Sequence, residues 1–214
     1  MKRLAIFDFD GTLFNTVDDV VINFNRALKA NNFPTLTYDE YIERLGGNID
    51  EVVSLILNDQ NTPENIELIK EEFGKLYAKS KKENSLPFPG ILNLLKDLES
   101  RNVLMAINSN RLTPSIKMFV ENSLCDIDFL EIEGYNPDFP SKPSPCGINK
   151  IIKKADVPLD DAIYIGDTKT DIKTARNAGI DCIIVKWGYG NQKDYDDEYV
   201  LGVVDEPSEI LNYF

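Results

Sequence analysis

The chain has 214 residues and no histidine, and its 36 acidic against 23 basic side chains give a formal net charge of −13. Without an imidazole, the chain cannot build Ser-His-Asp or Cys-His triads or histidine-ligated zinc sites. An enzyme of this composition must move protons with carboxylates, lysine or a metal. The negative charge repels nucleic acid and anionic membrane surfaces, so neither is an expected partner, and a phosphate site would need a local positive charge.

The cellular location is inferred from three widely spaced cysteines, which are Cys125, Cys146 and Cys182. They form no CxxC pair, and we expect them to be reduced thiols in a cytoplasmic protein. The apolar start of the chain is interrupted by Asp8 and Asp10, which makes it too short for an export signal. No run approaches the ~20 apolar residues that span a bilayer.

Residues 4–7 form a short apolar run that is typical of a strand buried on both faces. The sequence Asp8-Phe9-Asp10-Gly11-Thr12 follows it directly. In extended chain, residues two apart point to the same side, so Asp8 and Asp10 crowd together at the carboxyl edge of the sheet, where open α/β folds bind ligands. Two adjacent carboxylates repel each other unless a cation lies between them. The alternative is a polar strand end that runs into a turn.

Residues 15–86 contain helix signals and no convincing strand. The signals are two capping boxes, a glycine pair that ends a helix, and a proline in a first helical turn: Thr16 with Asp19, Thr37 with Glu40, Gly46-Gly47, and Thr62-Pro63. The proline-rich residues 86–90 are typical of a linker. We therefore expect an all-helical insert over 15–86, within a core formed by 1–14 and 87–214.

The rest of the chain alternates between strand and helix patterns. Apolar runs at 103–107, 162–165 and 182–185, with a weaker one at 129–132, predict buried strands. Helical spacing is found at 91–98, 148–152 and 170–178, and Gly179 suits the end of the last helix. This alternation predicts an α/β fold with a Rossmann-like parallel sheet flanked by helices.

Two further positions are placed to bind phosphate. Ser109 comes just after the predicted strand 103–107, in Asn108-Ser109-Asn110, where a hydroxyl and free backbone N–H groups can hold a phosphate oxygen. Lys142 lies in a loop stiffened by prolines, and a lysine neutralises phosphate as a point charge. Either residue on its own would more often be an ordinary turn residue.

Asp167 and Asp171 follow the predicted strand 162–165 and are four residues apart at the start of a helix. Both carboxylates can face one side of that helix start and complete an all-oxygen magnesium site. The alternative, that Asp167 is only a helix cap, gives Asp171 no role.

Taken in this order, the four elements resemble the motifs of the haloacid dehalogenase-like hydrolase superfamily, most of whose members are magnesium-dependent phosphatases. The matches are Asp8-Phe9-Asp10-Gly11-Thr12, Ser109 with Asn110, Lys142 in the form KPxP, and Gly166-Asp167 with Asp171. The helical insert lies where the subfamily resembling phosphoglycolate phosphatase carries its cap. The resemblance covers nearly the whole chain.

The resemblance implies a role for each matched residue. Asp8 would attack phosphorus to form an aspartyl-phosphate, and Asp10 would protonate the leaving group and later take a proton from water. Ser109, Asn110 and Lys142 would bind the phosphoryl group. Mg²⁺ would be held by Asp8, the backbone carbonyl of Asp10 and Asp167, with Asp171 holding the metal's waters or the surrounding loop.

Several activities within this superfamily remain open from the sequence. Asp10 favours a phosphatase or a phosphomutase, because the dehalogenases lack an acid at this position and the cation pumps carry threonine. The leading hypothesis is hydrolysis of a small soluble phosphate ester. Alternatives are a sugar phosphomutase similar to β-phosphoglucomutase, a pyrophosphatase, a non-catalytic phosphate-binding protein, and a phosphonate hydrolase, which would need a cap lysine such as Lys29, Lys70 or Lys75.

The predicted cap narrows the class of substrate. A closing helical lid excludes water and macromolecules, which favours a small phosphorylated metabolite. Arg44, in Arg44-Leu45-Gly46-Gly47, is a candidate to bind a carboxylate or second phosphate of that substrate. The alternative for Arg44 is a solvated arginine at a helix end. The sequence does not specify the oligomeric state.

Overall fold

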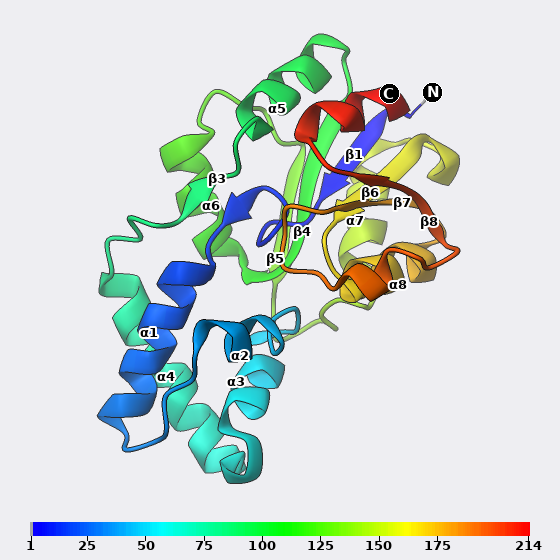
Figure 1. Ribbon diagram of the computed structural model, residues 1–214. Coiled ribbons are helices and arrows are strands. Elements are labelled where there is room, and N and C mark those ends of the chain that lie inside the picture. The colour runs from blue at the N-terminus through cyan, green and yellow to red at the C-terminus, as the bar shows by residue number, and fades with distance from the viewer. Residues whose placement is uncertain (1) are drawn as a thin grey trace. The chain divides into compact units, whose positions relative to one another are not determined.

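A computed structural model describes residues 2–214. The chain divides into two compact units, one formed by Met1–Phe14 with Pro87–Phe214 and the other by Asn15–Leu86 (Figure 1). The segments that connect them include two short strands, β2 (Phe14–Asn15) and β3 (Leu86–Pro87), which pair with each other. None of the described helices has both the length and the apolar character that a membrane span requires.

The first unit is built on a six-stranded parallel sheet in the order β5-β4-β1-β6-β7-β8 (Figure 1). The strands are β1 (Leu4–Phe7), β4 (Leu104–Leu112), β5 (Glu131–Tyr135), β6 (Ala162–Gly166), β7 (Asp181–Val185) and β8 (Val200–Val204). Phe7 at the end of β1 is in register with Ile107 and Ile165. The residues that follow therefore reach the carboxyl edge of the sheet at the same level. The predicted α/β fold with a parallel sheet is confirmed.

Helices flank this sheet in the first unit: α5 (Ile91–Ser100), α6 (Thr113–Ser123), α7 (Cys146–Ala155) and α8 (Lys169–Ala178), with short 3₁₀ turns η2 (Leu159–Asp161), η3 (Gln192–Asp194) and η4 (Pro207–Tyr213). The apolar sides of α7 and α8 pack on the sheet, where Ile148 and Ile172 join Leu4 and Ile6 in one buried cluster. Gly179 ends α8 in the left-handed conformation, with φ of 72°, as the sequence predicts.

The second unit is helical. It contains α1 (Val17–Ala30), α2 (Tyr38–Ile42), α3 (Ile49–Leu57), η1 (Asn58–Gln60) and α4 (Pro63–Lys79). Helices α1 and α3 both pack on α4, and the Phe24 and Phe73 rings stack with their centroids 3.8 Å apart. Two predicted helix starts are confirmed, because Thr37 and Glu40 form a reciprocal capping box and the Thr62 hydroxyl accepts the Asn65 N–H.

The predicted capping box of Thr16 with Asp19 is wrong. The Thr16 side chain makes no capping hydrogen bond at the start of α1. The buried Asp19 carboxylate instead accepts from the Asn84 N–H at 3.0 Å and from the Ser85 hydroxyl at 2.7 Å. Asp19 thus ties the start of the insert to its end. The two contacts span 65 and 66 positions of the sequence, so a local sequence pattern does not reveal them.

Other element boundaries also differ from the predictions. Helix α2 ends at Ile42, before the glycine pair, and a separate helix α3 follows with its own capping box of Asn48 and Glu51. Strand β4 extends past residue 107 to Leu112, and β5 covers 131–135 in place of 129–132. The sequence reasoning did not identify α6 or β8, although Pro114 in the first turn of α6 is a typical start signal.

Candidate active site

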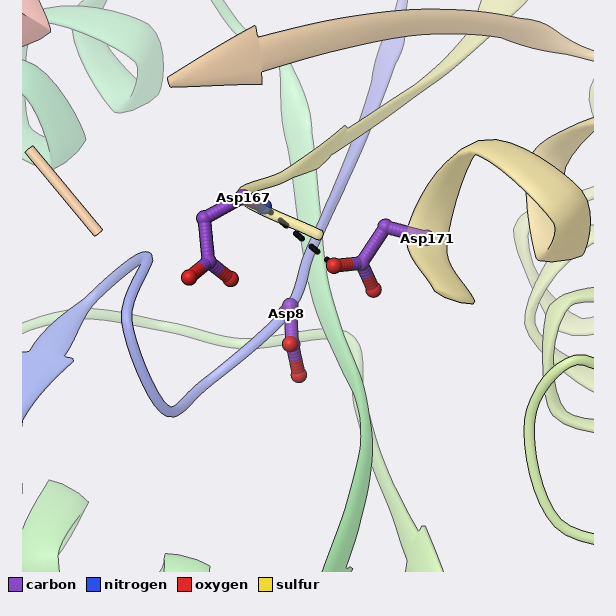
Figure 2. Close-up of side chains that lie close together, drawn as sticks. All are labelled: Asp8, Asp167 and Asp171. Atoms are coloured by element: carbon purple, nitrogen blue, oxygen red, sulfur yellow. Dashed lines mark hydrogen bonds between the residues drawn. The ribbon is translucent and has the colours of Figure 1, made fainter. Parts of the chain in front are cut away.

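Three buried carboxylates meet at the carboxyl edge of the sheet. Asp8 follows β1, Asp167 follows β6, and Asp171 lies in the first turn of α8 (Figure 2). Carboxylate oxygens from the three residues all lie within 4.8 Å of one another. The parallel register explains this convergence, because it ends β1 and β6 side by side. The sequence-predicted residues Asp8, Asp167 and Asp171 are therefore brought together.

Lys142 inserts its ammonium group among these carboxylates. Its Nζ lies 2.8 Å from Asp8 Oδ1 and 2.7 Å from Asp171 Oδ1, and the lysine is buried. It also donates to the Tyr164 hydroxyl at 3.2 Å, and that hydroxyl donates to the Asn108 carbonyl at 2.8 Å. The sequence reasoning missed Tyr164. The only sequence feature that could have indicated its role is a polar hydroxyl within an otherwise apolar, buried strand, β6.

The Lys142 loop is held by the residue next to Ser109. The Asn110 side chain accepts the Lys142 N–H at 2.8 Å and donates to the Lys142 carbonyl at 3.3 Å. Ser109 is buried, its hydroxyl accepts the Arg111 N–H at 3.2 Å, and it lies within the extended β4 and not after it. Ser109, Asn110 and Lys142 line a common cavity of about 90 Å³. Asn110 is thus engaged with the loop backbone.

The N-cap of helix α8 is Thr168, and not Asp167, and Thr168 forms a capping box with Asp171. One oxygen of Asp171 accepts from the Asp167 N–H at 3.2 Å, the Thr168 N–H at 3.0 Å and the Thr168 hydroxyl at 2.8 Å (Figure 2 shows the first of these bonds). The helix begins after Thr168. The alternative that Asp167 is a helix cap is therefore wrong, and Asp171 uses one oxygen for the cap and the other for Lys142.

The loop after β7 completes the surroundings of Asp167. The Tyr189 N–H donates to Asp167 Oδ2 at 2.7 Å, and the Thr12 hydroxyl donates to Oδ1 at 3.4 Å. The Trp187 indole N–H donates to the Thr12 carbonyl at 3.0 Å, so this loop is tied to the loop after β1. The sequence reasoning missed residues 187–190, although glycines that alternate with aromatic residues after a buried strand indicate a close backbone approach.

Two glycines allow the loops after β1 and β7 to approach Asp167 closely. Gly11 has φ of 80°, a conformation that L side chains rarely adopt, and a Cβ there would collide with the Asp167 carboxylate. A Cβ on Gly188 would collide with the same carboxylate and with the Gly11 carbonyl oxygen. Both loops therefore contact Asp167 at a separation that excludes any side chain.

The charges at the site are unbalanced. Burial raises the pKa of Asp8 to about 7, Lys142 opposes that rise, and Asp171 adds to it. Burial, followed by the charges of Asp171 and Asp8, raises the pKa of Asp167 well above its usual range. Burial lowers the pKa of Lys142, but Asp171 and Asp8 outweigh this effect and the pKa lies well above its usual range. One ammonium does not balance three carboxylates, and an all-oxygen donor set of this kind fits a hard divalent cation.

The Asp10 carboxylate is held by an arginine that the sequence reasoning missed. The Arg111 Nε lies 2.9 Å from Asp10 Oδ2, and its Nη2 lies 2.7 Å from Oδ1. The guanidinium also donates to the Ser115 hydroxyl at 3.1 Å and lies over the Phe119 ring at 5.5 Å. Arg111 follows Ser109 and Asn110 directly. Its place next to this motif is the only feature of the sequence that could have indicated its role.

Arg44 lies in the second unit, just past α2. Its guanidinium donates to the Glu40 carbonyl at the end of that helix, and its side chain is half-buried. This contact agrees with an arginine at a helix end, and a role in substrate binding stays a prediction.

Comparison with known proteins gives consistent matches over most of the chain. The family model described as haloacid dehalogenase-like hydrolase matches residues 5–185. A phosphoglycolate phosphatase of Vibrio parahaemolyticus is 25% identical over 215 residues, which cover 98% of this chain and 94% of the relative. A phosphoglycolate phosphatase of Aquifex aeolicus is also 25% identical, over 98% of this chain and 95% of its own.

The solved structures agree with this assignment. A crystal structure from Lactobacillus delbrueckii subsp. bulgaricus has a TM-score of 0.91 and 27% identity, with coverage of 100% of this chain and 98% of that one. The fold, the ordered motifs and the family match lead to one conclusion: the chain belongs to the haloacid dehalogenase-like hydrolases.

Proposed function

We propose that this chain is a magnesium-dependent phosphatase that hydrolyses a small phosphate monoester through an aspartyl-phosphate on Asp8. The observation that carries the proposal is the position of Lys142 Nζ, 2.8 Å from Asp8 Oδ1 inside a buried acidic cluster. A lysine at this position lowers the repulsion between a carboxylate nucleophile and a phosphate dianion. The relatives named phosphoglycolate phosphatase support a small ester of this class.

Each of these site residues then has a defined role in the proposed reaction. A carboxylate oxygen of Asp8 attacks phosphorus, and the bond from phosphorus to the leaving oxygen breaks. Asp10 gives a proton to the leaving alkoxide and afterwards takes one from the water that hydrolyses the aspartyl-phosphate. Lys142 and the Ser109 hydroxyl bind phosphoryl oxygens. The chain has no histidine, so a carboxylate such as Asp10 carries the proton transfers.

The donor set fits Mg²⁺, and we assign its binding to Asp8, Asp167 and the backbone carbonyl of Asp10. When bound, the cation supplies positive charge that offsets the repulsion between carboxylate and phosphate. Asp171 acts differently in this proposal, because one of its oxygens caps α8 and the other binds Lys142. It holds the ammonium and the loop at residues 166–168 in place for the reaction.

The test is an assay of small phosphate esters, among them 2-phosphoglycolate and p-nitrophenyl phosphate, with and without Mg²⁺. We expect that metal removal abolishes turnover, and that Asp8→Asn does so without loss of the fold. Asp59→Asn, which changes an exposed aspartate in the second unit, is the matched control and retains full activity. Full activity of the Asp8→Asn variant would exclude the covalent mechanism, and no turnover of any ester by the unmodified protein would favour the non-catalytic phosphate-binding alternative.

A further inference from the structure

The first unit carries a second cleft, of about 460 Å³, between residues 88–90, helix α5 and residues 205–208. Its apolar walls consist of an aromatic pair, two prolines and a leucine: Phe88, Trp187, Pro89, Pro207 and Leu94. Sites for small organic molecules have volumes in this range and mainly apolar walls with a few polar groups. None of its lining residues has a role in the phosphatase mechanism proposed above.

The walls of this cleft are fixed by contacts within the first unit. The Trp187 indole N–H is bound to the Thr12 carbonyl at 3.0 Å, which sets the orientation of the ring. Gly90, with φ of 88°, lies beside Pro207, where a Cβ would be in ordinary van der Waals contact with Pro207 Cγ at 3.4 Å. Arg101 of the segment after α5 donates to the Leu211 carbonyl of η4 at 2.8 Å. A ligand would therefore meet a largely preformed surface, which lowers the entropy cost of binding.

The polar groups of the cleft are acidic. Its lining includes Asp97, Asp205 and Glu206, together with Asn93 and Ser208, but no lysine or arginine. Asp205 is paired with Lys186 at 2.9 Å. Asp97 and Glu206 are exposed, and neither forms an ion pair within the described residues 2–214. Two carboxylates at an aromatic cleft attract a cation and repel the phosphate esters of the main site.

We propose that this cleft binds a small organic cation that has an aromatic or aliphatic body. The apolar body would occupy the space between Trp187, Phe88 and the prolines, and the ammonium group would face Asp97 and Glu206. An ammonium close to the face of a tryptophan gains cation–π attraction in addition to its attraction to the carboxylates. The proposed ligand is a cation and the proposed substrate is an anion, so the two sites would bind molecules of opposite charge.

The test uses three molecules of nearly the same shape and different charge: 2-phenylethylammonium, 2-phenylethanol and 3-phenylpropionate. Trp187 is the only tryptophan in the chain, so its selectively excited fluorescence reports occupancy of the cleft without any turnover. We expect a saturable change with the cation, about tenfold weaker binding of the alcohol, and no saturable change with the anion.

Two variants test the role of the carboxylates. Asp97→Asn and Glu206→Gln, combined, should reduce cation affinity to that of the alcohol and leave binding of the alcohol unchanged. Glu121→Gln, an exposed position on α6 outside the cleft, is the matched control and should bind the cation as before. The titration is repeated with saturating Mg²⁺, because a cation bound at Asp8 and Asp167 would be displaced by the metal.

Four outcomes would overturn the proposal. They are the absence of a saturable change with 2-phenylethylammonium, equal binding of the three molecules, an unaltered affinity in the double variant, and loss of the signal with Mg²⁺. The ligand series needs only the unmodified protein, so a variant that fails to fold does not leave the question open.

Discussion

The Arg111 guanidinium holds the Asp10 carboxylate through two nitrogens, with Nε 2.9 Å from Oδ2 and Nη2 2.7 Å from Oδ1. A two-point contact of this kind fixes the plane of the carboxylate as well as its position. The contact joins residues 101 positions apart, and it connects the loop after β1 to the end of β4. If Asp10 is the acid and base of the reaction, Arg111 is a positioning residue that acts through it.

Arg111→Met should therefore impair the proton transfer more than the attack on phosphorus. We expect kcat/KM for 2-phosphoglycolate, whose alkoxide needs a proton, to fall on the order of 10²-fold, the cost of a small misplacement of a catalytic group. For p-nitrophenyl phosphate, whose leaving group needs no proton, the loss should be much smaller. Steady-state assays of both esters across pH give the comparison.

The matched control for Arg111 is Arg176→Met. Arg176 also pairs with an aspartate, Asp197, and lies 5.0 Å from the Tyr199 ring centre, so it has the same local chemistry without a contact to Asp10. Its removal should leave both kcat/KM values unchanged. An equal loss for the two esters in Arg111→Met would indicate a purely structural role.

Removal of Lys142 should destabilise the fold as well as abolish activity. Lys142→Met leaves Asp8 and Asp171 buried without their shared cation, and breaking a buried ion pair from one side costs roughly 3–5 kcal/mol of unfolding free energy. Denaturant unfolding measures that loss. Lys150→Met is the control, because Lys150 lines the same 90 Å³ cavity but forms a half-exposed pair with Glu133, worth less than about 1 kcal/mol. Equal stability of the two variants would contradict the burial argument.

Stability of the metal-free protein should depend on pH through the site carboxylates. The pKa of Asp8 is raised from 3.8 to about 7 in the folded protein, so the folded state binds more protons than the unfolded chain between these values. Unfolding free energy therefore falls as the pH rises through this window. Mg²⁺ binds the deprotonated carboxylates, so its stabilising effect should be larger at about pH 8 than at about pH 5.

Thermal unfolding with and without Mg²⁺ at the two pH values checks this expectation. Asp8→Asn should reduce the dependence of the metal-free protein on pH, whereas Asp59→Asn should not. A shift in Tm on metal addition that is the same at both pH values would show that the carboxylates are already ionised in the metal-free protein.

The sequence predicted those features of the fold and site that are encoded locally. An apolar run that ends in Asp8 indicated both a buried strand and the edge where it ends, and α8 was bounded by its spacing and by Gly179. Contacts between distant segments were not predictable in this way. Arg111 reaches Asp10, Tyr164 reaches Lys142, and Asn84 reaches Asp19 only after the chain has folded. Periodicity and motif spacing contain no information about such partners.

Gly188 offers the sharpest test of the loop that sequence reasoning missed. Any side chain at this position would collide with the Asp167 carboxylate and with the Gly11 carbonyl, both fixed parts of the site. Gly188→Ala should therefore displace the loop that donates the Tyr189 N–H to Asp167. We expect a marked loss of Mg²⁺ affinity, measured by calorimetry, together with a fall in kcat/KM. Gly74→Ala is the control. A Cβ at Gly74 would have no neighbouring atom within 4 Å, and Gly74 is exposed on α4. That substitution should raise stability by up to about 1 kcal/mol through helix propensity and leave metal affinity unchanged. Normal Mg²⁺ affinity in Gly188→Ala would mean that the close approach of the β7 loop is not needed to hold Asp167 for the metal.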